Sequence, residues 1–215
     1  MSTTQKDLYI LLALALLPCI TWGLITFGCK MPGYNVNHPR WLSGYPLYRI
    51  IHLLRTLTFL PMLMSAYKKF LPALYDAHQK IYTRCSILSM ICILCGLFVK
   101  TKFWNYILDG CFVSPLIEEL IARFVLYEAR NKGFKMYALV AIITSLSFGL
   151  MHFGYEPSLF TKSIILSKLS EHFVFGLILC SVFWFLPRLS LLIIIHALSN
   201  LIGILADASE LGAKF

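Results

Sequence analysis

The sequence contains little charge, and its acidic residues are fewer than its basic ones. Only 13% of the 215 residues are charged and 10 are Asp or Glu, whereas 59% are hydrophobic. The mean hydropathy of +0.75 lies well above the range of ordinary soluble domains. This shortage of charge excludes an ordinary soluble domain and predicts a membrane protein.

Several catalytic and binding motifs are missing as well. There is no G-x-S-x-G nucleophile elbow, no phosphate-binding glycine loop and no H-E-x-x-H zinc motif. The seven cysteines are odd in number and most lie within apolar runs, so they imply no disulfide framework. Cys92 and Cys95 form a C-x-x-C without a βαβ context, which favours packing over redox or metal chemistry.

The formal net charge of +9 raises the question of nucleic-acid binding. The basic residues, however, are scattered through short connectors such as "YKKF" and "EARNKGFK". Such placement is typical of helix ends at an anionic lipid surface. We therefore predict the lipid bilayer, and no nucleic acid, as a partner.

Apolar runs between charged or Pro/Gly-rich breaks predict about seven transmembrane helices. A cleaved signal peptide is the alternative for the first run, but no A-x-A-like site follows it. Stretches 67–84 and 155–173 suit amphipathic helices in the membrane interface. The predicted spans are 8–28, 47–66, 85–104, 112–128, 136–153, 172–187 and 189–206. We predict an all-α, polytopic bundle that forms one membrane domain over residues 1–215, with N-terminal spans in 1–104.

Two adjacent acids and a base interrupt the apolar stretch "SPLIEELIAR". Ser114 and Pro115 resemble an N-cap followed by proline at the first helical position. Glu119 and Arg123 are four residues apart, a spacing that favours an ion pair on one helix. Glu118 points about 100° away from Glu119, and either pairs with a basic residue of another helix or faces a polar cavity. An ionisable residue inside a membrane span is a functional candidate by default.

His196 and Asn200 lie four residues apart on an otherwise apolar helix. A lone histidine there would more often be a core residue, but histidine with asparagine one turn later needs hydrogen-bond partners that lipid cannot supply. His152 lies at the end of its predicted span. If the spans alternate in direction, Glu118, His152, His196 and Asn200 lie toward the same membrane face and can converge in one cavity.

This set of side chains suits hydrolysis of an amide bond. A carboxylate and a histidine can activate water, while a second histidine and an asparagine donate hydrogen bonds to an oxyanion. The same set also resembles a zinc site with His152, His196 and a glutamate as ligands. The residues alone leave both chemistries open.

Three motifs occur in a fixed order on apolar helices: E-E-x-x-x-R at 118–123, F-x-x-x-H at 148–152 and H-x-x-x-N at 196–200. Together they resemble the motifs of the CPBP family, which contains CAAX proteases and bacteriocin-processing enzymes and is also called the Abi family of intramembrane proteases. The resemblance covers roughly residues 110–206, so we predict the catalytic core in 105–206.

The resemblance implies a glutamate-dependent intramembrane endopeptidase that acts on a membrane-associated or lipidated peptide. By position, Glu118 would act with His152 to activate water, and His196 with Asn200 would stabilise the oxyanion. Glu119 and Arg123 would form a supporting ion pair. The similarity favours a mechanism without a cofactor, with zinc as the alternative.

The compact chain is more like the bacterial family members, which predicts a multi-pass protein of a bacterial cell membrane. The alternative function is a non-catalytic immunity or scaffold protein that binds a bacteriocin-like peptide.

Overall fold

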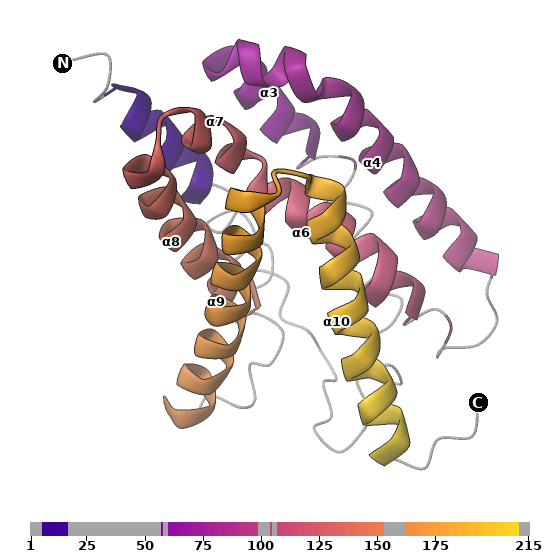
Figure 1. The fold of residues 1–215 in the computed structure, drawn as a ribbon. Helices are drawn as coiled ribbons and strands as arrows, with labels where there is room; N and C mark the ends of the chain where they lie inside the picture. The colour runs from indigo at the N-terminus through magenta and orange to yellow at the C-terminus, as the bar shows by residue number, and fades with distance from the viewer. Residues whose placement is uncertain are drawn as a thin grey trace. The chain divides into compact units, whose positions relative to one another are not determined.

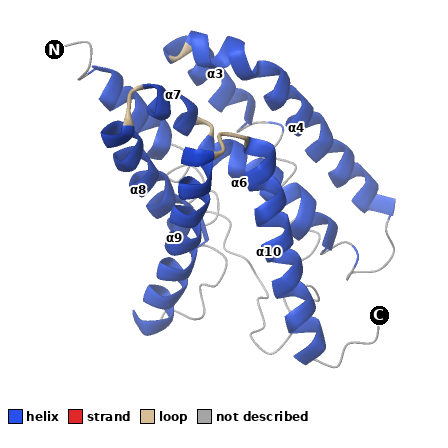
Figure 2. Ribbon diagram, viewed as in Figure 1, coloured by secondary structure: helices blue, strands red, loops and turns tan. Residues whose placement is uncertain are grey.

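The computed structural model shows an α-helical protein, and its described residues contain no strand (Figure 2). The all-α prediction is therefore confirmed for this part of the chain. The structure describes residues 6–16, 57, 60–98, 104, 107–152 and 162–210.

The chain forms two compact units, each made from two separate stretches of sequence. Unit 1 comprises residues 1–36 and 121–188, and unit 2 comprises residues 37–120 and 189–215. Helix α6 (Ser114–Arg123) contributes its first seven residues to unit 2 and its last three to unit 1. The predicted division between 1–104 and 105–206 stays a prediction.

Unit 1 is built around two long helices, α8 (Phe134–Met151) and α9 (Lys162–Phe185), which run side by side in opposite directions (Figure 1). Helix α7 (Val125–Asn131) precedes α8 and packs against it. Gly133 forms the turn between them with a φ of 94°, a conformation that glycine adopts readily. The α8–α9 pair provides the scaffold for the functional side chains of this unit.

A glycine allows α8 and α9 to approach each other closely. A Cβ atom at Gly176 would lie 3.0 Å from the Cβ and 3.1 Å from the Cα of Ser145. It would also lie 3.1 Å from Nη2 of Arg123. The absence of a side chain at this position therefore makes room for both the neighbouring backbone and a buried guanidinium group.

Ionic contacts at Lys132 link the N-terminal helix, 6–16, to the end of α7. Lys132 Nζ lies 2.7 Å from Asp7 Oδ2 and 3.4 Å from Glu128 Oε1. The hydrogen bond to Asp7 is the main reason that the pKa of Lys132 is raised. Because these side chains are partly exposed to solvent, the contacts contribute about 1 kcal/mol or less to stability.

Unit 2 contains helices α3 (Leu60–Phe70), α4 (Pro72–Phe98) and α10 (Leu189–Glu210) and the π-helix η2 (Asp109–Val113). Helices α3 and α4 pack together, and the hydroxyl group of Tyr82 donates a hydrogen bond to the Leu60 carbonyl oxygen. Helix η2 packs against both α4 and α10. The π-helix leads directly into α6, which carries the two adjacent glutamates.

The predicted single helix over 112–128 is wrong, because η2, α6 and α7 follow one another there with a turn at Phe124. Ser114 is not an N-cap, because it is helical and its N–H donates to the Asp109 carbonyl oxygen five residues earlier. Pro115 provides the physical reason. Its ring lacks an N–H and clashes with a carbonyl in a regular α-helix, whereas a wider π-turn before it relieves that conflict.

Two predicted boundaries between interfacial helices and spans are also wrong. Helix α4 joins the predicted surface helix 67–84 to the predicted span 85–104. Helix α9 likewise joins the later part of 155–173 to the span 172–187. A change from polar to apolar composition does not end a helix, because backbone hydrogen bonding continues through both compositions unless a proline or a turn interrupts it.

Two helices among the described residues are long and apolar enough to cross a membrane, Phe134–Met151 and Leu189–Ala206. The apolar segment Leu169–Phe185 of α9 is shorter. The predicted spans 8–28 and 47–66 fall largely outside the described residues, so the bundle of seven spans stays a prediction.

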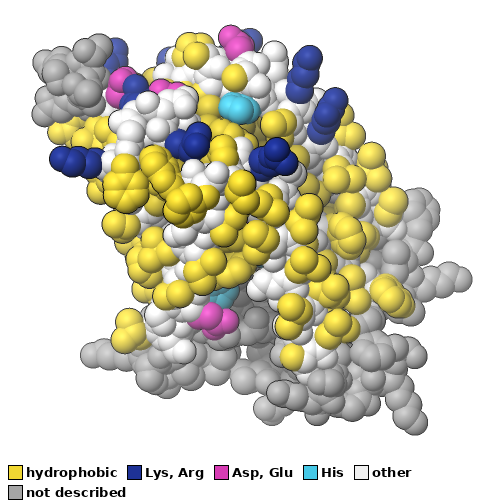
Figure 3. All heavy atoms as spheres, viewed as in Figure 1, with side chains coloured by type: hydrophobic (Ala, Val, Ile, Leu, Met, Phe, Trp, Pro, Cys, Tyr) yellow, Lys and Arg dark blue, Asp and Glu magenta, His cyan; other side chains and the backbone are white. Residues whose placement is uncertain are grey.

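Large hydrophobic side chains are exposed along α8, α9 and α10, and hydrophobic side chains cover much of the surface in Figure 3. The exposed residues on these three helices include Leu139, Ile142, Leu146, Leu150, Val174, Ile178, Ile194, Leu198, Ile202 and Leu205. Water solvates such a surface poorly, whereas lipid chains accommodate it. The surface therefore has the character expected of a membrane protein.

Candidate active site

The two adjacent glutamates of α6 are buried, together with a histidine of α10. The exposed fractions are 4% for Glu118, 0% for Glu119 and 3% for His196. All three residues belong to unit 2. Burial of two carboxyl groups costs several kcal/mol unless polar partners surround them, so this cluster needs an explanation other than packing.

His196 provides polar contacts to both glutamates. Its Nδ1 lies 2.8 Å from Glu119 Oε1, and its Nε2 lies 3.8 Å from Glu118 Oε2. When the Glu119 carboxylate is ionised it can only accept a hydrogen bond, so Nδ1 of His196 carries the hydrogen. Nε2, the other ring nitrogen, is therefore the atom available on the Glu118 side.

Asn200 anchors the next turn of α10 to the π-helix. Its Nδ2 donates a hydrogen bond of 2.7 Å to the Gly110 carbonyl oxygen. The irregular turn leaves this carbonyl group available to the asparagine, whereas a regular helix would use it internally. The asparagine amide has a second N–H, which can donate elsewhere.

His152 belongs to unit 1, where it forms the C-cap of α8. Its Nδ1 lies 2.8 Å from the Phe148 carbonyl oxygen. A carbonyl oxygen only accepts, so Nδ1 must donate and the neutral ring keeps its lone pair on Nε2. The backbone therefore selects the tautomer in which Nε2 can act as a base.

Arg123 is fully buried in unit 1, with its guanidinium carbon 5.0 Å from the centre of the Phe148 ring. The Phe148 ring also lies 4.6 Å from that of His152. The phenylalanine thus contacts a residue of the first motif and one of the second, partly through a cation–π interaction. The ion pair predicted between Glu119 and Arg123 stays a prediction.

The structure brings together Glu118, Glu119 and His196, with Asn200 one turn further along α10. The sequence predicted that Glu118 and His196 would converge, but not that Glu119 contacts His196. His152 lies in the other unit, so its predicted pairing with Glu118 stays a prediction.

Residues 100–202 match the family model described as type II CAAX prenyl endopeptidase Rce1-like. This match contains all three motifs. This region belongs to the CAAX protease family. Searches of curated proteins and of solved structures found no significant match. The match indicates a protease of the CAAX type for this region.

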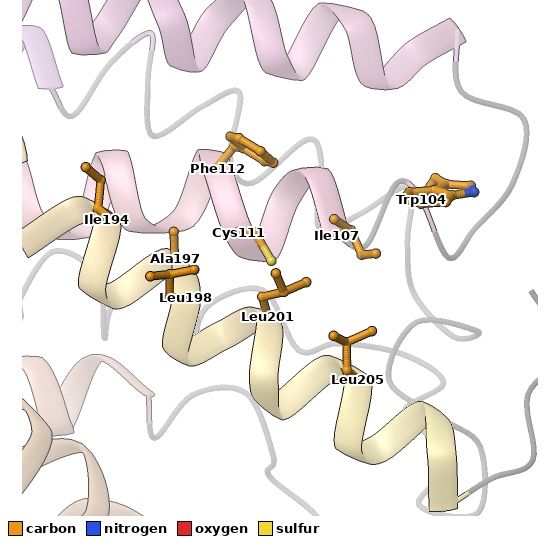
Figure 4. Close-up of a pocket in the computed structure, with 9 residues that line it drawn as sticks. All are labelled: Trp104, Ile107, Cys111, Phe112, Ile194, Ala197, Leu198, Leu201 and Leu205. Carbon is orange, nitrogen blue, oxygen red and sulfur yellow. The ribbon is translucent and has the colours of Figure 1, made fainter.

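An apolar pocket of about 650 Å³ lies in unit 2 (Figure 4). One wall is a face of α10, and the opposite wall comes from η2 and the residues before it. The lining residues are Trp104, Ile107, Cys111, Phe112, Ile194, Ala197, Leu198, Leu201 and Leu205. Ala197 and Leu201 directly follow His196 and Asn200 along the chain, so the pocket and the polar cluster use the same turns of α10.

Sequence reasoning missed one histidine of the CAAX protease region, His172 on α9. Its ring stacks on that of His152, with the ring centres 4.0 Å apart and an angle of 24° between the planes. The signal was present in the sequence, because His172 is another ionisable residue within a largely apolar segment. The three-motif pattern does not include it.

No three His, Cys, Asp or Glu side chains among the described residues are arranged to hold a metal ion. The predicted zinc ligands His152 and His196 belong to different units. Within unit 2, Nδ1 of His196 is directed at Glu119 rather than at a shared centre.

Proposed function

We propose that this CAAX-type endopeptidase hydrolyses a peptide bond of a membrane-associated or lipidated protein, using water activated by Glu118 and His152. The observation that carries the proposal is the contact of His196 with two buried glutamates, at 2.8 Å from Glu119 and 3.8 Å from Glu118. These three residues belong to two motifs of the protease family. A cluster that is costly to bury and lies in such motifs supports a catalytic role.

In the proposed reaction, Glu118 acts with His152 to remove a proton from water as the oxygen attacks the scissile carbonyl carbon. The carbonyl oxygen becomes an oxyanion in a tetrahedral intermediate. The C–N bond then breaks, and the proton taken from water passes to the leaving nitrogen. One water molecule is consumed, and one carboxyl group and one amine are formed.

His196 and Asn200 are the proposed donors to the oxyanion. Because Nδ1 of His196 donates to Glu119, a second donation from Nε2 requires the imidazolium form, whose charge the two glutamates balance. Asn200 donates one N–H to Gly110 and is proposed to donate the other to the oxyanion. Glu119 and Arg123 then have supporting roles, in which they hold the catalytic groups in place.

Cleavage of a defined peptide tests the proposed function. The purified protein, reconstituted in lipid vesicles, is incubated with a prenylated CAAX peptide and with the same peptide lacking the prenyl group. Mass spectrometry is expected to find one cleaved peptide bond in the prenylated substrate. If the folded protein cleaves neither peptide and binds one of them, the non-catalytic alternative is supported instead.

We propose a mechanism without a metal cofactor, with zinc as the alternative. The expected result is that prolonged dialysis against a strong chelator leaves the cleavage rate within about twofold of the untreated rate, because Glu118 and His152 activate the water themselves. Metal analysis of the purified protein provides the second measurement. Stoichiometric zinc together with chelator-sensitive cleavage would overturn the metal-free mechanism.

The apolar pocket is the proposed binding site for a prenyl group on the substrate. A volume of about 650 Å³ lies within the range of about 300–1,000 Å³ that ligand pockets commonly have. The lining side chains carry no charge, which suits a hydrocarbon chain. The family's prenyl specificity, as its description names it, supports the same assignment.

Filling the pocket is expected to weaken the binding of a prenylated peptide. The substitution Leu201→Trp adds bulk inside it, so KM should rise about tenfold, which corresponds to about 1.4 kcal/mol of lost binding. Ile202→Trp is the matched control, because Ile202 is 68% exposed on the same helix and does not line the pocket. Equal KM values in the two variants would contradict the prenyl assignment.

A further inference from the structure

His152 is held on three sides by groups of unit 1. Its Nδ1 is hydrogen-bonded to the Phe148 carbonyl oxygen at 2.8 Å. The Phe148 ring lies at 4.6 Å from its ring centre, tilted by 55°. The His172 ring lies at 4.0 Å and is nearly parallel, at 24°. The hydrogen bond sets the tautomer, and the two rings restrict rotation of the imidazole.

The stacking partner comes from a different helix than His152. His152 is the C-cap of α8, whereas His172 lies within α9. Its ring also lies 6.3 Å from that of Phe148. Because α8 and α9 pack tightly along their length, His172 places a planar surface at a fixed position beside the end of α8.

We propose that His172 is a positioning residue for His152. This inference rests on the proposed function, in which Nε2 of His152 takes part in activating water. Ring stacking by His172 keeps the imidazole plane, and therefore the direction of the Nε2 lone pair, in one orientation. Misplacement of a catalytic group by about 1 Å can reduce the rate by about 10²-fold, so control of this ring matters for the rate.

The proposed role requires the flat ring of His172 and does not require its two nitrogen atoms. If stacking is the function, a phenyl ring at position 172 preserves it and a methyl group does not. His172→Ala is therefore expected to lower kcat about tenfold with KM unchanged. His172→Phe should remain within about threefold of the wild-type kcat. Val174→Ala is the matched control, because Val174 is exposed on α9 and truncation there should leave kcat unchanged.

An NMR measurement tests the positioning independently of activity. With ¹⁵N-labelled histidine at a pH where His152 is neutral, the wild type and His172→Phe should show mainly the Nδ1–H tautomer of His152. His172→Ala should show a larger fraction of the other tautomer and altered ring proton shifts, because the ring can rotate. An unchanged His152 ring and an unchanged kcat in His172→Ala would overturn the inference, as would a His172→Phe variant as slow as His172→Ala.

Failure of the proposed function gives a different result. In that case the wild type cleaves neither peptide, or His152→Ala cleaves as fast as the wild type, whatever happens at position 172. The NMR comparison still decides whether His172 positions the His152 ring.

Discussion

Glu118→Gln is expected to reduce the rate of peptide cleavage at least about 10³-fold while the protein remains folded. Glutamine has nearly the same size and shape as glutamate but cannot accept a proton from water. General base catalysis typically accelerates a reaction about 10²–10⁴-fold, and Glu118 is buried where bulk water cannot readily replace it. The measurement is single-turnover cleavage of the prenylated peptide in vesicles, with helical content compared by circular dichroism.

Two further variants make this prediction specific to the Glu118 carboxylate. Glu118→Asp keeps the acid but shortens the side chain by one methylene, so an intermediate loss of about 10–100-fold is expected. Glu128→Gln is the matched control, because Glu128 forms an ion pair with Lys132 on a partly exposed surface. Its rate should stay within about twofold of wild type. A Glu118→Gln protein that keeps more than a tenth of the wild-type rate would remove Glu118 from the mechanism.

Glu119→Ala is expected to reduce both stability and activity. The substitution leaves His196 Nδ1 without the carboxylate that lies 2.8 Å away in a fully buried position. Removal of one partner from a buried ionic contact typically costs about 3–5 kcal/mol. The rate should also fall about 10–100-fold, because loss of an orienting partner has this effect on a functional histidine. Unfolding in mixed detergent micelles and cleavage kinetics measure the two effects.

Glu119→Gln distinguishes the role of the hydrogen bond from that of the charge. It keeps an acceptor oxygen near Nδ1 of His196, so its stability should lie between those of the wild type and Glu119→Ala. The double variant Glu119→Ala with His196→Ala is expected to lose less stability than the sum of the losses in the two single variants. Ile202→Ala is the control on α10, since Ile202 is exposed there and does not line the pocket. Strictly additive losses would show that Glu119 and His196 are not coupled.

Much of the candidate site could be predicted from the sequence because its residues interrupt apolar helices. Glu118, His152, His196 and Asn200 were all identified on that ground, and the structure places them on helices or, for His152, at a helix end. The helix boundaries were predicted less well. Ser114 before Pro115 has the composition of a helix start, yet the chain enters α6 through a π-helix, and no local pattern distinguishes these two routes.

The contact between Glu119 and His196 shows what helical spacing alone does not reveal. The i,i+4 rule considers only neighbours on the same helix, so it predicts a pair of Glu119 with Arg123 and gives no information on contacts with other helices. His196 is 77 residues away in the sequence and reaches Glu119 only because α10 packs beside α6. The stacking of His172 on His152 could not be predicted for the same reason, since the two rings become neighbours only when α8 and α9 pack together.

The sequence alone was enough to predict a helical membrane protein and to identify three motifs of the CAAX protease family, because hydropathy and short spacings are properties of the local chain. Tertiary structure decided which ring nitrogen each glutamate and carbonyl oxygen faces, and which side chains hold His152 and His196 in place. These contacts join helices far apart in the sequence. Their geometry depends on how closely two backbones approach, as at Gly176, and such distances exist only in the folded protein.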